Sequence, residues 1–322
     1  MERQLRIVYM GTPEFAVAPL RAILEAGYPV VAVVTAPDKP AGRGRNLRPS
    51  AVKEFALEHG LKILQPVSLK DPDFIEELRS CDANLQVVVA FRMLPEKVWE
   101  MPEYGTFNLH ASLLPQYRGA APINRAIMNG ETETGITTFF LTHEIDTGNI
   151  LFREKYPIYP VDDAGALHDR LMTAGAGLVI RTIAAVRRAD YSLYGQESLV
   201  EAETELKGAP KIFREDCEIN WNLSGNEIHN QVRGLSPFPG AFGKLISGEG
   251  TAYTLKIFRT VFQHGDSTGE NGSLLTDGKT FLSVRVADGI LNLLEVQMEG
   301  KKRLTTPEFL RGFTVKEGWW MR

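Results

Sequence analysis

Residues 5–16 read LRIVYMGTPEFA, and this stretch sets the first element of the fold. Its apolar run over residues 5–10 ends at a glycine, which is typical of a strand buried on both faces. The apolar residues of 16–26 then recur three and four positions apart, which predicts a helix, and residues 29–35 (PVVAVVT) predict a second strand. A strand, a helix and another strand in this order form the βαβ unit of a parallel sheet.

The same alternation continues along the first half of the chain. Further strands are predicted at 62–65, 85–90, 106–110 and 136–141. Helices are predicted from the cap residue Ser50 to residue 59, and at 73–79, 122–128 and 163–188. Strands that alternate with helices imply an α/β domain with a Rossmann-like, mostly parallel sheet.

The pattern changes after the long helix. Residues 189–209 are polar and lack clear periodicity, so 190–208 is interpreted as a linker. Beyond it, residues 253–262, 279–286 and 290–297 are strand-like and are separated by turn signals such as Asp277-Gly278. The sequence therefore predicts an α/β domain over residues 1–189 and a smaller β-barrel domain over residues 209–322.

Composition narrows the functional classes. The chain has 322 residues, 43% hydrophobic and 24% charged, and its formal net charge of −4 gives no whole-protein case for nucleic-acid binding. Cys81 and Cys217 lack the spacing of a disulfide framework or a zinc site, so buried free thiols and no metal are expected. No signal peptide and no apolar run of membrane length are found, and a cytoplasmic monomer is expected.

Three segments follow predicted strands, where ligands bind in an open α/β sheet. The first, Gly11-Thr12-Pro13-Glu14-Phe15, is neither a GxGxxG motif nor a P-loop, so a bound dinucleotide or ATP is not indicated. From this segment alone, a Gly–Pro turn that opens a helix is the favoured interpretation.

The other two segments carry polar side chains. Asn108 and His110 alternate along a strand and share one face, and Asp146 follows the next strand in a turn with Thr147-Gly148. If the two strands are neighbours, Asp146 can reach His110 and set its protonation while Asn108 stabilises an oxyanion, which suits acyl transfer to an amine. An α-amino group has a pKa of about 7.7–8.0, so no strong base is needed. A hydrogen-bonded structural pair and a simple turn are the alternatives.

These residues and the run that follows them resemble a known family. Asn108, His110 and Asp146, with the run SLLPQYRGAAP over residues 112–122, are similar to the formyltransferases that use 10-formyltetrahydrofolate. The resemblance implies that these three residues are catalytic and that the folate lies near residue 90 and the Asp146 loop. The folate contacts that it implies are Phe91, Arg92, Met93, Leu94, Ser112, Leu113, Leu114, Pro115 and Asp146. The family commonly has glycine where this chain has Arg92, in a run that is one residue shorter here.

Further stretches resemble the branch of the family that formylates methionyl-tRNA. They are GTPEFA at 11–16, the basic segment at 37–53, and the start of the C-terminal domain at 209–240. The resemblance implies an OB-like, tRNA-binding barrel, a methionyl pocket lined by Phe15, and formyl transfer to methionyl initiator tRNA for translation initiation. A formyltransferase for a small amine, such as an amino sugar or nucleotide, is the alternative. A non-catalytic RNA-binding protein is disfavoured because Asn108, His110 and Asp146 are all present.

The basic segment at 37–53 (PDKPAGRGRNLRPSAVK) stands out in an acidic chain. It has five cations and one acid, and its prolines and glycines predict an irregular loop. Arginine forks suit phosphate oxygens, so a tRNA contact is predicted here, with a solvated loop as the alternative. A second small cationic cluster follows residue 300. The predicted tRNA contacts are Lys39, Arg43, Arg45, Arg48, Lys301, Lys302 and Arg303.

Overall fold

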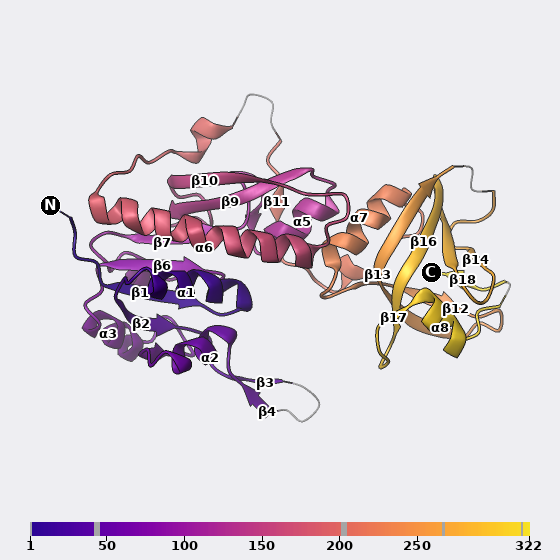
Figure 1. Cartoon of the computed structure of the whole chain (residues 1–322), viewed down its shortest axis with the longest axis horizontal. Coiled ribbons are helices and arrows are strands. Elements are labelled where there is room, and N and C mark those ends of the chain that lie inside the picture. Colours follow the sequence, from indigo (N-terminus) through magenta and orange to yellow (C-terminus); the bar gives the residue numbers. More distant parts are fainter. Residues whose placement is uncertain (1, 42–45, 201–204, 266–267, 317) are drawn as a thin grey trace. The chain divides into compact units, whose positions relative to one another are not determined.

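The structure is a computed structural model that describes residues 2–41, 46–200, 205–265, 268–316 and 318–322. Contacts divide the chain into two compact units (Figure 1). The N-terminal unit comprises Met1–Gly119, Thr134–Pro157 and His168–Gly208, and the C-terminal unit comprises Ala120–Glu133, Ile158–Leu167 and Ala209–Arg322. The predicted division at residues 189 and 209 stays a prediction.

The N-terminal unit contains a seven-stranded sheet in the order β10-β9-β7-β6-β1-β2-β5. Its strands are β1 (Ile7–Gly11), β2 (Val30–Val34), β5 (Ile63–Leu64), β6 (Leu85–Val89), β7 (Thr106–His110), β9 (Glu133–Phe140) and β10 (Ile150–Pro157). The pairs β1–β2, β1–β6, β2–β5 and β6–β7 are parallel, whereas β7 and β9 are antiparallel. The predicted Rossmann-like, mostly parallel sheet is therefore confirmed.

Helices cover both faces of this sheet (Figure 1). They are η1 (Glu14–Ala16), α1 (Val17–Glu25), α2 (Ala51–Glu58), α3 (Pro72–Ser80), α4 (Glu96–Trp99) and α6 (Ala164–Arg188). On one face, Phe74 of α3 and Val98 of α4 share a core with Val8 and Val88 of the sheet. On the other, Thr182 of α6 shares a 2.9 Å hydrogen bond with Thr138 of β9. Covered faces explain why β1 and β6 are buried at every residue.

The prediction of an irregular loop at 37–53 was wrong for the residues on either side of 42–45, which form two short strands. The described residues of this segment contain an antiparallel pair, β3 (Lys39–Ala41) and β4 (Asn46–Arg48), with Lys39 opposite Arg48. Both strands of a two-stranded ribbon are edges, where a proline such as Pro40 removes no required ladder bond. Lys53 forms a 2.6 Å ion pair with Asp38 just before the ribbon. The predicted contacts Arg43 and Arg45 lie outside the described residues.

Residues 190–200, predicted as part of a linker, are attached to the N-terminal unit. Tyr194 and Ile150 form an antiparallel bridge, and the short helix η2 (Gln196–Leu199) follows it. Leu199 packs against a small core of Leu114, Phe139 and Ile150. Further on, β11 (Gly208–Ala209) pairs with β8 (Arg118–Gly119). The polar sequence of residues 189–209 did not indicate these contacts, because most of them are formed by backbone groups.

The C-terminal unit contains a second seven-stranded sheet, in the order β14-β15-β16-β13-β12-β18 with β17 paired to β16. The strands are β12 (Ala241–Ile246), β13 (Ala252–His264), β14 (Leu274–Thr276), β15 (Leu282–Val286), β16 (Gly289–Met298), β17 (Leu304–Thr305) and β18 (Trp320–Met321). An antiparallel bridge between Ser273, just before β14, and Trp320 of β18 connects the first and last strands in this order. The sheet is therefore nearly closed, and the predicted barrel is confirmed.

Helices pack on this barrel-like sheet. The unit contains α5 (Pro122–Met128), η3 (Glu215–Cys217), α7 (Gly225–Leu235) and α8 (Thr306–Gly312). Ile228, Val232 and Leu235 place the buried side of α7 in the barrel core, together with Trp221 and Phe309. Both cysteines are free and buried, as predicted. Within the described residues, no helix combines the length and apolar character that a membrane crossing requires.

We predict that one histidine of α7 makes the stability of the folded protein depend on pH. His229 shares a 2.8 Å hydrogen bond with Thr260, and burial lowers the pKa of His229 from 6.5 to about 4, with a contribution from Arg233. The neutral form is therefore favoured in the folded state, and its contribution to stability is complete above pH 6.5 and is lost as the pH falls towards 4. We expect His229→Gln to flatten the decline of the thermal midpoint between pH 6.5 and 4. The control His143→Gln, at an exposed histidine, should retain the wild-type decline.

Candidate active site

The central feature is His110 on the inner strand β7. The imidazole is 6% exposed, and its Nε2 lies 2.8 Å from the backbone oxygen of Tyr117. A carbonyl oxygen only accepts hydrogen bonds, so Nε2 must carry the hydrogen that is donated to it. In the neutral ring, Nδ1 is then the nitrogen with a free lone pair, and it lies 3.8 Å from Oδ2 of Asp146. Nδ1 is therefore available to take up a proton, and Asp146 is placed to pair with the charged ring.

Asp146 reaches His110 by a route that the sequence did not indicate. Because β9 is antiparallel to β7, Thr137 lies opposite His110 and the end of β9 lies opposite Phe107. The loop at residues 141–149 must therefore turn back from the far edge of the sheet. A Cβ at Gly148 would lie 1.7 Å from the backbone oxygen of Phe140, so the tight return requires glycine. The backbone N–H of Gly119 donates a 2.9 Å hydrogen bond to Oδ2 of Asp146.

Asn108 lies on the same face of β7 as His110 and is half-buried. In the part of the chain that the structure describes, its side-chain amide has no hydrogen-bond partner. A half-buried amide beside a positioned imidazole is thus free to donate to a ligand oxygen. The arrangement agrees with the predicted use of Asn108, His110 and Asp146, whose catalytic roles stay predictions.

Unusual backbone conformations concentrate around this site. Among the described residues, five non-glycine residues have positive φ, and three of them follow strands of the N-terminal sheet at the site: Ala90 (46°), Tyr117 (60°) and Asp146 (56°). Such conformations cost about 1–3 kcal/mol each and cluster where function requires a fixed geometry. They occur in the loops that follow β6, β7 and β9 and mark these three loops as the candidate site.

Several predicted folate contacts are already bonded within the chain. Arg92 lies 5.3 Å from the ring of Phe91, and its guanidinium donates to the backbone oxygens of Pro66 and Val67 at 2.9 and 3.1 Å. Ser112 donates to the backbone oxygen of Gln116 at 2.6 Å. The side chain of Arg92 thus braces the neighbouring turn instead of pointing away from the chain.

The other predicted folate contacts differ in exposure. Leu94, Leu114 and Pro115 are buried, Phe91 and Leu113 are half-buried, and Met93 is 74% exposed. An incoming ligand would therefore meet Phe91, Met93 and Leu113 first, and the whole set stays a prediction. Phe15, predicted for the methionyl pocket, is buried and lies edge-on to His168 with ring centroids 5.2 Å apart.

The predicted tRNA contacts that are described are exposed. Lys39 and Arg48 face each other on the ribbon, and neither has an ionic partner in the described chain. Lys301, Lys302 and Arg303 are exposed in the C-terminal unit, where Arg303 pairs with Glu295 and lies over the ring of Phe258. Arg303 is therefore partly neutralised.

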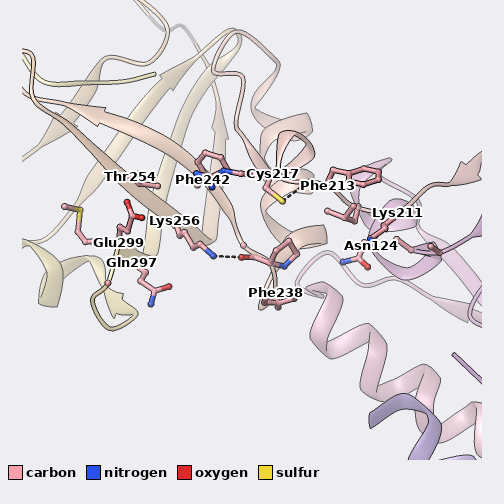
Figure 2. A pocket seen from close by; sticks show the side chains of 18 residues that line it. Asn124, Lys211, Phe213, Cys217, Phe238, Phe242, Thr254, Lys256, Gln297 and Glu299 are labelled. Carbon is pink, nitrogen blue, oxygen red and sulfur yellow. Dashed lines mark hydrogen bonds between the residues drawn. The ribbon is translucent and has the colours of Figure 1, made fainter. Parts of the chain in front are cut away.

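Two features were missed by the sequence reasoning. The amide of Gln196, inside the predicted linker, is buried against the Asp146 loop. The C-terminal unit also contains a cavity of about 790 Å³, lined in part by Lys211, Arg214 and Lys256 (Figure 2). The spacing of charges in the sequence indicates neither feature, because Gln196 is neutral and the cavity residues come from separate elements.

A group of potential metal ligands lies outside this site. Donor atoms of Glu96, Glu100 and His143 lie within 4.8 Å of one another, and all three residues are exposed. His143 also lies edge-on to Trp99, at 5.4 Å between ring centroids. Exposed acidic groups are common without an ion, and the expectation of no metal stays a prediction.

The two folds and the site define a class of enzyme, the formyl transferases. A family model described as "Formyl transferase" matches residues 5–183, and one described as "Formyl transferase, C-terminal domain" matches residues 211–314. The chain belongs to this family. Relatives named methionyl-tRNA formyltransferase include a Bacteroides fragilis protein, 53% identical over 100% of this chain and 99% of its own. The Flavobacterium johnsoniae protein of that name is 48% identical over 98% of each chain.

Solved structures show the same fold at lower identity. The sugar 3N-formyl transferase WlaRD, crystallised with dTDP and 5-N-formyl-THF, has a TM-score of 0.62 and 22% identity over 93% of this chain and all of its own. HypX from Aquifex aeolicus, in complex with tetrahydrofolic acid, has a TM-score of 0.58 and 18% identity over 98% of this chain and 49% of its own. At these identities the likeness supports the fold alone.

Proposed function

We propose that this enzyme transfers the formyl group of 10-formyltetrahydrofolate to the free α-amino group of methionyl initiator tRNA. The product is formylmethionyl-tRNA for translation initiation, which places the enzyme in the cytoplasm. The observation that carries the reaction is the placement of Nδ1 of His110, 3.8 Å from Asp146, on the same strand face as the Asn108 amide, which has no hydrogen-bond partner among the described residues. Identity to methionyl-tRNA formyltransferases over the full chain supports the acceptor.

Each of the three side chains has a defined role in this scheme. The folate supplies the formyl group and a nitrogen that leaves with a proton. Asn108 donates a hydrogen bond to the formyl oxygen as negative charge develops on it. Nδ1 of His110 takes the proton that the attacking amine loses and returns it to the leaving nitrogen. Asp146 stabilises the imidazolium that exists between these two transfers.

Nε2 of His110 keeps its hydrogen bond to the backbone oxygen of Tyr117 throughout this cycle. One new C–N bond forms to the amino group, and the C–N bond to the folate breaks. The ring therefore ends in the tautomer in which it began, ready for the next turnover.

The ribbon supports RNA as the acceptor. Like charges that lie directly opposite each other on paired strands destabilise the pair, and Lys39 faces Arg48. A bound phosphate relieves this repulsion, whereas the small-amine alternative gives the exposed pair no task. Because both residues lie in the segment that resembles the methionyl-tRNA branch, they are the described residues best suited to test the acceptor.

The cavity of the C-terminal unit has the composition of a nucleic-acid contact. Three cations and one acid, Glu299, line it, and the exposed residues Phe213 and Phe238 are also among its lining residues. Cations for phosphates combined with exposed rings for unpaired bases are typical of sites for single-stranded nucleic acid. Lys256 is held in place by its 2.7 Å bond to the backbone oxygen of Pro239, drawn in Figure 2.

We expect Lys39→Ala/Arg48→Ala to raise KM for methionyl-tRNA about 10–100-fold and to leave kcat and KM for the folate near their wild-type values. Two lost phosphate contacts should also reduce the slope of log affinity against log salt by about 2. Steady-state kinetics and RNA binding at several salt concentrations measure both effects.

The matched control is Lys70→Ala/Arg188→Ala, which removes the same charge from two other exposed positions of the N-terminal unit. It should retain the wild-type KM and salt slope. A rise in the folate KM with unchanged RNA affinity would show that the ribbon serves the folate and would remove it from the acceptor site.

A further inference from the structure

Gln196 is a buried amide with a fixed position. It begins η2 and is 1% exposed. Two residues earlier, Tyr194 exchanges backbone hydrogen bonds of 2.9 and 3.0 Å with Ile150, the first residue of β10. Three residues later, Leu199 packs against the small core that contains Ile150. The chain on both sides of Gln196 is therefore held against the end of the 141–149 loop.

The Gln196 side chain makes four hydrogen bonds. Nε2 donates to the backbone oxygens of Asp146 and Gly148 at 2.8 and 2.9 Å. Oε1 accepts from Nε and Nη2 of Arg118 at 3.0 and 2.7 Å. Arginine only donates and carbonyls only accept, so the chemistry of the partners fixes which end of the amide is nitrogen. The group uses both of its N–H donors and both lone pairs.

These four bonds connect the two segments that meet at the carboxylate of Asp146. Arg118 immediately precedes Gly119, whose N–H donates to that carboxylate at 2.9 Å. On the other side, Asp146 has a φ of 56°, a conformation that persists only where its surroundings over-determine it. The two bonds from Nε2 hold the backbone of this strained turn, and the Arg118 bonds hold the segment that carries Gly119.

We propose that Gln196 is a positioning residue for Asp146 in formyl transfer. The effect on kcat that we expect from this assignment rests on the proposed function. Without the amide, the turn is free to relax and the carboxylate no longer has a fixed place beside Nδ1 of His110. Small displacements of catalytic groups cost up to about 100-fold in rate.

The kinetic test is a double-mutant cycle. We expect Gln196→Met, which keeps the length of the side chain and removes all four bonds, to lower kcat about 30-fold with KM for methionyl-tRNA unchanged. In an Asp146→Asn background the same change should cost less than about 3-fold, because the group that it positions is already disabled. Equal losses in both backgrounds would show that Gln196 does not act through Asp146 and would overturn the assignment.

A second variant separates the two pairs of bonds. Gln196→Glu keeps the acceptor for Arg118 but has no N–H for the oxygens of Asp146 and Gly148. It should lose kcat about as Gln196→Met does. Near-normal kcat in Gln196→Glu would show that the bonds to the turn are dispensable, which also overturns the assignment.

Gln231 provides the matched control. Its Nε2 likewise donates to two backbone oxygens, those of Asp216 and Glu218 at 2.9 and 3.1 Å, but in the C-terminal unit. Gln231→Met should leave kcat at the wild-type value. A loss equal to that of Gln196→Met would attribute the effect to general destabilisation.

Amide hydrogen exchange supplies a readout that needs no turnover. In Gln196→Met, peptides covering residues 144–149 should exchange faster than in the wild type, and in Gln231→Met they should not. Unchanged exchange overturns the positioning role even if the enzyme is active. If the wild type makes no formylmethionine, the proposed function fails, and the exchange measurement still decides whether Gln196 holds the turn.

Discussion

Replacing His110 with glutamine is expected to lower kcat for formylation about 10³-fold, within the range for loss of a general acid–base group. A glutamine amide can place an N–H near the position of Nε2 and keep the bond to the backbone oxygen of Tyr117. It has no titratable nitrogen to replace Nδ1 beside Asp146. The fold and RNA affinity should therefore stay close to the wild type, measured by thermal midpoint and by direct binding of methionyl-tRNA.

His110→Ala is the companion variant. It removes Nδ1 as well, and it also removes the buried hydrogen bond from Nε2 to the oxygen of Tyr117, which contributes about 0.5–1.5 kcal/mol to the free energy of unfolding. The two variants should thus share the loss of turnover and differ in stability. Near-normal turnover in His110→Gln would remove the imidazole from the mechanism.

The second large effect is expected at Asn108. Asn108→Leu keeps the shape of the side chain and removes its N–H donors, so kcat should fall about 10²–10³-fold with little change in either KM. Because the described chain gives the Asn108 side chain no hydrogen-bond partner, stability should change little. Steady-state kinetics with both substrates and a thermal unfolding curve measure the two quantities.

Asn84→Leu is the matched control for this variant. The Asn84 side chain accepts from the N–H of Arg6 at 2.8 Å and donates to the backbone oxygen of Gln4 at 2.7 Å. Its loss should lower stability and leave kcat unchanged, the reverse of the pattern at Asn108. A normal kcat in Asn108→Leu would contradict the assignment of an oxyanion donor.

The N-terminal sheet was predictable because its strands are buried on both faces. Such strands are continuous apolar runs, and β7 and α5 were predicted with the bounds that the structure shows. The direction of β9 was not predictable, because periodicity carries no information about which way a strand runs. The ribbon β3–β4 was not predicted because proline argues against an internal strand, whereas both strands of this ribbon are edge strands that tolerate it.

Other elements had signals that were overlooked. The helix α7 begins with a capping box in which Ser224 and Glu227 bond reciprocally, a pattern visible as S-x-x-E. The strand β12 reads AFGKLI, and its glycine, which weakens a strand prediction, packs against Trp221 in the core of the barrel-like sheet.

The site was predictable only in part. Alternation along β7 was enough to place Asn108 and His110 on one face. The approach of Asp146 depends on the return of a loop, and the role of Gln196 depends on docking of a polar segment from 50 residues further along the chain. Both depend on tertiary contacts, which produce no periodic pattern in the sequence.

The most direct test of the central claim is formylation by the purified wild-type protein. We predict that 10-formyltetrahydrofolate and methionyl-tRNA together yield formylmethionyl-tRNA, detected as formylmethionine after release of the amino acid from the RNA. An amino-sugar nucleotide offered at the same concentration should yield no formylated product. Formylation of the sugar with no formylmethionine would contradict the account.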